Sequence, residues 1–73
     1  MSLSESLKNM RMKALLSQEE LAKALGVSVG TINRWENGKT KPNISAMKNI
    51  RAFCAQNELP YEIIESEWLK DKE

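Results

Sequence analysis

Apolar residues near the start of the chain recur at the spacing of one helical face. In steps of four, three and four residues, these apolar positions are Leu3, Leu7, Met10 and Ala14. Ser2 and Glu5 have the spacing of a capping box, in which two side chains satisfy free backbone amides at a helix start. The pattern therefore predicts a first helix that begins directly after Ser2.

Two short helices are predicted next. Ser17 and Glu20 form a second capping-box pattern, and Gly26 can take the left-handed conformation that ends a helix after about two turns. Ser28 then caps a third helix, and Gly38 closes its C-terminal end. Because so few residues separate these two helices, they must cross at a steep angle, which is the geometry of a helix-turn-helix.

Two further helices are predicted from proline and from apolar spacing. Pro42 and Asn43 open the fourth helix. Its apolar stripe consists of Ile44, Met47, Ile50 and Phe53. Pro60 suits the first turn of a fifth helix, where a missing backbone amide costs nothing. The stripe of that helix consists of Tyr61, Ile64 and Trp68. We expect part of this stripe to complete the core and part to support a homodimer; the alternative is that all of it packs inside one chain.

Length and composition limit what such a chain can do. With 73 residues it has room for one small domain. Histidine is absent and Cys54 is the only cysteine, which excludes histidine-dependent catalysis, zinc sites with several Cys and His ligands, and an intramolecular disulfide. No apolar run approaches the roughly 20 residues that a membrane helix needs. We therefore expect a cytoplasmic protein that is not an enzyme, has no cofactor or metal and does not bind a membrane.

The net charge of +1 combines two unlike parts with the single negative charge of Glu5 near the N-terminus. Residues 7–52 carry nine basic and three acidic side chains, a net charge of +6, whereas residues 53–73 carry two lysines and six acidic residues, a net charge of −4. Such asymmetry indicates an anionic partner for the first part and an acidic extension behind it. The alternative is that helical surfaces simply carry many charges.

The stretch Ser17–Pro42, SQEELAKALGVSVGTINRWENGKTKP, resembles the Cro and lambda-repressor type of helix-turn-helix domain. Seven positions of the family pattern match: Leu21, Ala22, Leu25, Gly26, Val27, Ile32 and Trp35. The Glu36-Asn37-Gly38 sequence and the downstream Pro42 add to the match. The resemblance implies an all-α, compact five-helix lambda-repressor-like fold, in which the second and third helices form the helix-turn-helix. It divides the single domain 1–73 into a core, residues 7–54, and an acidic helical extension, residues 58–73.

The third helix, residues 28–36, is the recognition helix of such a domain. If Ile32 and Trp35 point inward, helical rotation of about 100° per residue fixes the face that points outward. The residues on or beside that face are Val29, Gly30, Asn33, Arg34 and Asn37. In a major groove, Arg34 can bind guanine through two hydrogen bonds, Asn33 can read adenine and Val29 can contact a thymine methyl group. The alternative is a solvated polar face with an incidental glycine.

Gly30 departs from the family, which more often has a long polar side chain at this position. The departure predicts sparse direct readout, or a closer approach of the helix backbone to DNA, with some specificity from DNA shape.

Phosphate contacts are expected from polar residues around the recognition helix. The resemblance implies that Gln18, at the start of the second helix, binds a backbone phosphate. The other expected phosphate contacts are Ser28, Thr31, Asn37, Lys39, Thr40 and Lys41. Each could instead be an ordinary cap or a solvated side chain.

The resemblance also implies an ion pair between Arg11 and Glu36, which would join the first helix to the end of the third. Its role would be to fix the orientation of the helices, because buried pairs often gain little net energy. Trp35 is expected in the core, and Cys54 is expected to be a small buried apolar residue.

The sequence therefore favours a sequence-specific, DNA-binding transcriptional regulator of the bacterial or phage repressor type, dimeric on a palindromic operator of double-stranded DNA. One alternative is an antitoxin, which would bind DNA and would also bind a protein partner through the acidic C-terminal helix. Another is a protein-interaction adaptor without DNA binding. The joint presence of four residues argues against it: Gln18, Arg34, Asn37 and Lys39.

Overall fold

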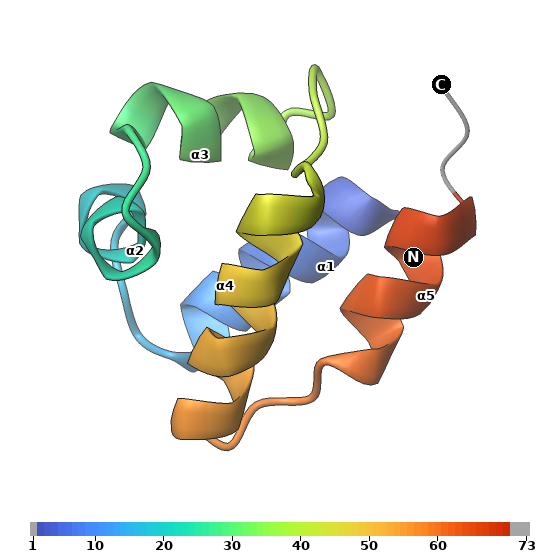
Figure 1. Cartoon of the computed structure of the whole chain (residues 1–73). Helices are drawn as coiled ribbons and strands as arrows, with labels where there is room; N and C mark the ends of the chain where they lie inside the picture. The colour runs from blue at the N-terminus through green and yellow to red at the C-terminus, as the bar shows by residue number, and fades with distance from the viewer. Residues whose placement is uncertain (1, 71–73) are drawn as a thin grey trace.

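The computed structural model describes residues 2–70, which form five α-helices and no strand (Figure 1). The helices are α1 (Leu3–Lys13), α2 (Gln18–Leu25), α3 (Val29–Glu36), α4 (Ile44–Gln56) and α5 (Glu62–Lys70). The predicted all-α, five-helix architecture is confirmed. None of these five helices combines the length and the apolar character that crossing a bilayer requires.

Side-chain caps start the first four helices, as the sequence predicted. The capping residues are Ser2, Ser17, Ser28 and Asn43, and each accepts a hydrogen bond from the backbone amide three residues later. The capping boxes of Ser2 with Glu5 and of Ser17 with Glu20 are complete. The prediction that Pro60 lies in the first turn of the fifth helix is wrong. The carbonyl of Tyr61 accepts the first helical bond of α5, from Glu65, so Pro60 lies two residues ahead of the first helical residue, Glu62.

Four helices end at a residue in the left-handed conformation. These residues are Leu15, Gly26, Gly38 and Glu58, with φ between 55° and 73°. After α1, the amide of Leu16 donates to the carbonyl of Arg11 (3.2 Å), and the amide of Leu15 donates to that of Met12 (3.0 Å). Sequence patterns predicted only the glycine positions, because glycine takes positive φ without a steric cost.

Leu15 gives a direct test of this strained helix end. Its side chain is 89% exposed, so it gains little packing in return for a positive φ of 60°. Leu15→Gly is expected to raise the free energy of unfolding by about 0.5–1 kcal/mol, because relief of strain outweighs the greater freedom of the unfolded chain. Urea unfolding measures the change. Leu15→Ala keeps the strain and should leave stability nearly unchanged; equal stability of the two variants would contradict the explanation.

The core is formed by the inward faces of all five helices. Its buried apolar members are Leu3, Leu7, Met10, Leu21, Ala22, Leu25, Ile32, Trp35, Ala46, Met47, Ile50, Phe53, Cys54 and Ile64. The expectation that Trp35 and Cys54 are core residues is confirmed. The Cys54 Sγ lies 3.5 Å from the Met10 Sδ, and burial raises the pKa of the Cys54 thiol above its ordinary value.

Ile44 is a correction to the predicted stripe of α4. It is 65% exposed, while Ala46 and Cys54 are buried instead. Residues three apart differ in direction by about 60° around a helix axis. Over the three steps from Phe53 back to Ile44 these differences add up, so Ile44 no longer points toward the core.

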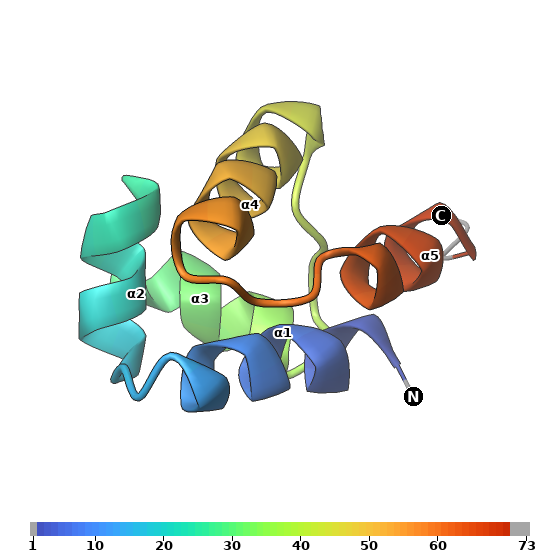
Figure 2. The same cartoon turned by 90° about the horizontal axis from the view of Figure 1, so that it is seen from below.

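Helix α5 packs against α1, at the opposite end of the molecule from α2 (Figure 2). Ile64 is only 1% exposed, and Tyr61 and Trp68 pack against the same core. The indole N–H of Trp68 donates to the carbonyl of Pro42 at 2.7 Å. All three residues of the α5 stripe therefore contact the core of their own chain, with Tyr61 and Trp68 only partly buried. The exposed apolar side chains of this helix are Ile63 and Leu69.

Candidate nucleic-acid interface

Helices α2 and α3 pack directly against each other, and α3 forms an outer edge of the molecule (Figure 1). Ala22 is buried at α2, and its carbonyl accepts a hydrogen bond from the amide of Val27 in the turn at 3.0 Å. Ile32 and Trp35 point inward, so the opposite face of α3 is free. Asn33, Arg34 and Asn37 are exposed, and Val29 is 43% exposed. The outward face predicted from helical geometry is therefore present.

Arg34 lies back along α3 over Gly30. A Cβ atom placed on Gly30 would lie 3.5 Å from the Nη1 of Arg34 and 3.8 Å from the Oγ of Ser28, both ordinary contacts. Gly30 also has none of the positive φ that favours glycine. The fold therefore does not require glycine at position 30. Any role of the missing side chain lies on the outer face of α3.

Gly30→Ala separates stability from binding. The variant is expected to raise the free energy of unfolding by about 0.5–1 kcal/mol, because alanine loses less backbone entropy in a helix. It is expected to weaken DNA binding, because the added methyl group lies on the face expected to enter the groove. Thermal unfolding and DNA titration measure the two effects. If binding is unchanged while stability rises, the glycine is incidental.

A partly buried ion pair joins α1 to the end of α3. Arg11 and Glu36 form two hydrogen bonds, from Nε to Oε2 at 2.7 Å and from Nη2 to Oε1 at 3.0 Å. Arg11 Nη1 also donates to the carbonyl of Leu16 at 3.0 Å. The side chains are 12% and 5% exposed, respectively. The hydrogen bonds to Glu36 raise the pKa of Arg11. The pair implied by the resemblance is therefore present.

A series of amide side chains continues from this pair to the exposed face of α3. Gln18 Nε2 donates to Glu36 Oε1 at 3.0 Å. Asn33 Nδ2 donates to Gln18 Oε1 at 3.5 Å, and Asn37 Nδ2 donates to Asn33 Oδ1 at 3.1 Å. Three residues expected to contact DNA are therefore linked to each other and to the ion pair. No sequence pattern indicates the links of Gln18 to Glu36 and to Asn33, because they join side chains of different helices whose relative rotation is set by packing.

Ser28 and Thr31 are engaged at the start of α3. Ser28 Oγ accepts from the amide of Thr31 at 3.1 Å, and the two hydroxyl oxygens are 2.9 Å apart. Ser28 therefore acts as a helix cap in the free chain, and both hydroxyl groups lie at the amide-rich end of α3, where a phosphate is favoured.

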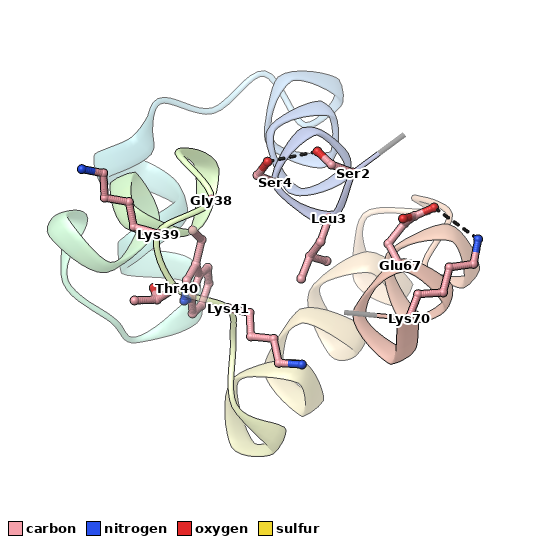
Figure 3. A pocket seen from close by; sticks show the side chains of 10 residues that line it. Ser2, Leu3, Ser4, Gly38, Lys39, Thr40, Lys41, Glu67 and Lys70 are labelled. Atoms are coloured by element: carbon pink, nitrogen blue, oxygen red, sulfur yellow. Dashed lines mark hydrogen bonds and ion pairs between the residues drawn. The ribbon is translucent and has the colours of Figure 1, made fainter. Parts of the chain in front are cut away.

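The loop after α3 separates its two lysines. Figure 3 shows Lys39 and Lys41 leaving the loop in opposite directions, beside a concavity that reaches the start of α1 and the end of α5. Lys39 and Thr40 are exposed. The Lys41 Nζ lies 5.4 Å from the centre of the Trp68 ring, which is a cation–π contact. Lys41 is therefore directed toward α5, whereas Lys39 points away from it.

Comparison with known proteins identifies this arrangement. A family model described as helix-turn-helix matches residues 7–54. The chain belongs to the helix-turn-helix family. This confirms the resemblance to the Cro and lambda-repressor type.

The helix-turn-helix chain is also similar to the HTH-type transcriptional activator BcrR of Enterococcus faecalis, with 42% identity over 53 residues. The aligned part is 73% of this chain and 26% of the relative, so the chain spans about a quarter of that relative's length. No group of three or more His, Cys, Asp or Glu side chains that could hold a metal ion occurs within residues 2–70.

Proposed function

We propose that this helix-turn-helix chain is a sequence-specific DNA-binding transcriptional regulator without enzymatic activity. The observation that carries the proposal is the free face of α3, which presents Arg34 and Asn33 beside the exposed Val29 and the side-chain-free Gly30. An α-helix with such a face fits the major groove, where arginine and asparagine match the hydrogen-bonding edges of guanine and adenine. Similarity to a protein named a transcriptional activator supports a regulatory role.

The proposed contacts fall into two groups. Base contacts come from Val29, Gly30, Asn33 and Arg34. Phosphate contacts come from Gln18, Ser28, Thr31, Asn37, Lys39, Thr40 and Lys41. Of this second group, Lys41 contributes least, because its ammonium group stacks on Trp68. Repression or activation then depends on where the operator lies relative to the promoter, since both require the same occupancy of a DNA site.

Selection of bound sites from a random pool of duplexes tests this function. The expected result is one enriched half-site, present as an inverted repeat with centres about one helical turn apart. The intact chain is used, with the Arg34→Ala variant in a parallel selection. Recovery of random sequences by the wild-type chain would contradict sequence-specific binding.

We further propose that the chain binds as a homodimer. The described part extends 28 × 25 × 21 Å, so two copies side by side can reach half-sites about 34 Å apart. Ile44 is exposed at the start of α4, next to the loop that follows α3, and it lines an apolar depression together with Pro42 and Trp68. An exposed apolar side chain at this place suits a contact between two copies on DNA.

Ile44→Glu tests the dimer surface. A buried charge in the contact should weaken binding to the inverted repeat about tenfold, because the second copy no longer assists the first. Binding to a single half-site should be unchanged. Met12→Glu is the matched control, since Met12 is similarly exposed (56%) but lies on α1. Equal effects of both variants, in DNA titration and in sedimentation, would contradict the assignment of this surface.

A further inference from the structure

The amide side chains between α2 and α3 form a series with one direction. Starting from Glu36, each oxygen accepts a hydrogen bond from the amide nitrogen of the next residue. The order is Glu36, Gln18, Asn33 and Asn37, with separations of 3.0, 3.5 and 3.1 Å. The series starts at a nearly buried carboxylate and ends on the exposed face of α3.

The carboxylate of Glu36 sets this direction. An ionised carboxylate only accepts hydrogen bonds, whereas an amide group can present either its oxygen or its nitrogen to a neighbour. Glu36 is held by two bonds from Arg11 and has a side chain only 5% exposed, so its position is fixed. Gln18 must therefore turn its nitrogen toward Glu36 and its oxygen toward Asn33. By the same reasoning, Asn33 turns its nitrogen toward Gln18 and its oxygen toward Asn37.

Asn33 keeps a matched pair of free groups in this arrangement. It uses one of its two N–H groups and one of the two acceptor positions on its oxygen, so one donor and one acceptor remain. A donor beside an acceptor is the combination that binds the N7 and N6 atoms of adenine in the major groove.

We propose that Glu36 and Gln18 are positioning residues that orient Asn33 to read adenine, so that each half-site carries an adenine opposite Asn33. This inference rests on the proposed function. Asn33 is not needed for the junction of α3 with α1, because Arg11 already holds Glu36 with two hydrogen bonds and the Leu16 carbonyl with a third. The bond from Asn33 to Gln18 links α3 to α2 instead, and it involves a side chain of the face expected to enter the groove.

Gln18→Leu tests the inference, because it removes the middle of the series while leaving the Arg11–Glu36 pair in place. Competition among duplexes that differ at one base pair measures base preference at every position of the selected half-site. Gln18→Leu should lower the preference for adenine at one position by about tenfold, within the range that one side chain's paired contacts provide. Preference at the other positions should persist, including that for guanine opposite Arg34.

Two comparisons keep a structural effect apart from a positioning effect. In an Asn33→Ala background, Gln18→Leu should cause no further loss of adenine preference, because the group that it orients is gone. Lys39→Ala is the control for a lost phosphate contact and should weaken all duplexes equally. In the free chain, the side-chain amide NMR signals of Asn33 should shift in Gln18→Leu and stay in place in Lys39→Ala.

The outcomes are distinguishable. An adenine preference that survives Gln18→Leu, or one that Asn33→Ala leaves intact, would overturn the inference while the proposed function stands. A wild-type chain without base preference at any position would overturn both.

Discussion

Arg34→Ala is expected to cost roughly 1–3 kcal/mol of binding free energy on the preferred site and much less on random DNA. Arg34 is exposed on the outward face of α3, and its guanidinium group lies along the helix over Gly30. From there it can extend to a base edge, where two hydrogen bonds to guanine carry sequence information. Titration of the selected duplex and of a random duplex, across a range of salt concentrations, measures both costs.

Lys39→Ala is the matched comparison for Arg34→Ala. Lys39 is exposed in the loop beyond the end of α3, and Figure 3 shows its side chain pointing away from α5. The Lys39 side chain should contact only a DNA phosphate. The variant should therefore weaken both duplexes about equally and reduce the salt dependence by a slope of roughly 0.9 per chain. If Arg34→Ala weakens both duplexes equally while Lys39→Ala changes site preference, the proposed orientation of α3 in the groove is wrong.

Much of the fold could be predicted from the sequence because local signals and packing agree. Ser17 and Gly26 mark both ends of α2, and the structure places each of them in the expected conformation. Prediction failed where no local signal exists. Leu15 and Glu58 take a positive φ that their side chains disfavour. Each is held in this conformation by two backbone hydrogen bonds in the turn that ends its helix. Ile44 was misplaced because apolar spacing alone does not reveal which side of a helix faces its neighbours.

The candidate site shows the same division between local and tertiary information. The outward face of α3 follows from the inward positions of Ile32 and Trp35, so rotation along a single helix was sufficient. The links of Gln18 to Glu36 and to Asn33 depend on how α2 lies against α3, which no pattern within one helix records. The stacking of Lys41 on Trp68 joins residues far apart in the sequence and was missed for the same reason.

Arg11→Ala is expected to lower the free energy of unfolding by about 3 kcal/mol, the largest stability effect that we predict. The substitution leaves the carboxylate of Glu36 nearly buried, with Gln18 as its remaining donor, and it also removes the donor to the Leu16 carbonyl. An unpaired charge at such a site costs more than the intact pair gains, because desolvation is no longer compensated. Thermal and urea unfolding measure the loss.

The double variant Arg11→Met, Glu36→Leu separates the cost of a broken pair from the value of the pair itself. Both charges are removed and both sites keep an apolar side chain of similar length, so its stability should fall within about 1 kcal/mol of the wild type. Its DNA binding should nevertheless change, because Gln18 loses the acceptor that orients it. An unchanged melting temperature in Arg11→Ala would show that the pair is solvated in solution. Equal destabilisation of the single and double variants would show instead that the ion pair itself, rather than avoidance of an unpaired charge, stabilises the junction of α1 and α3.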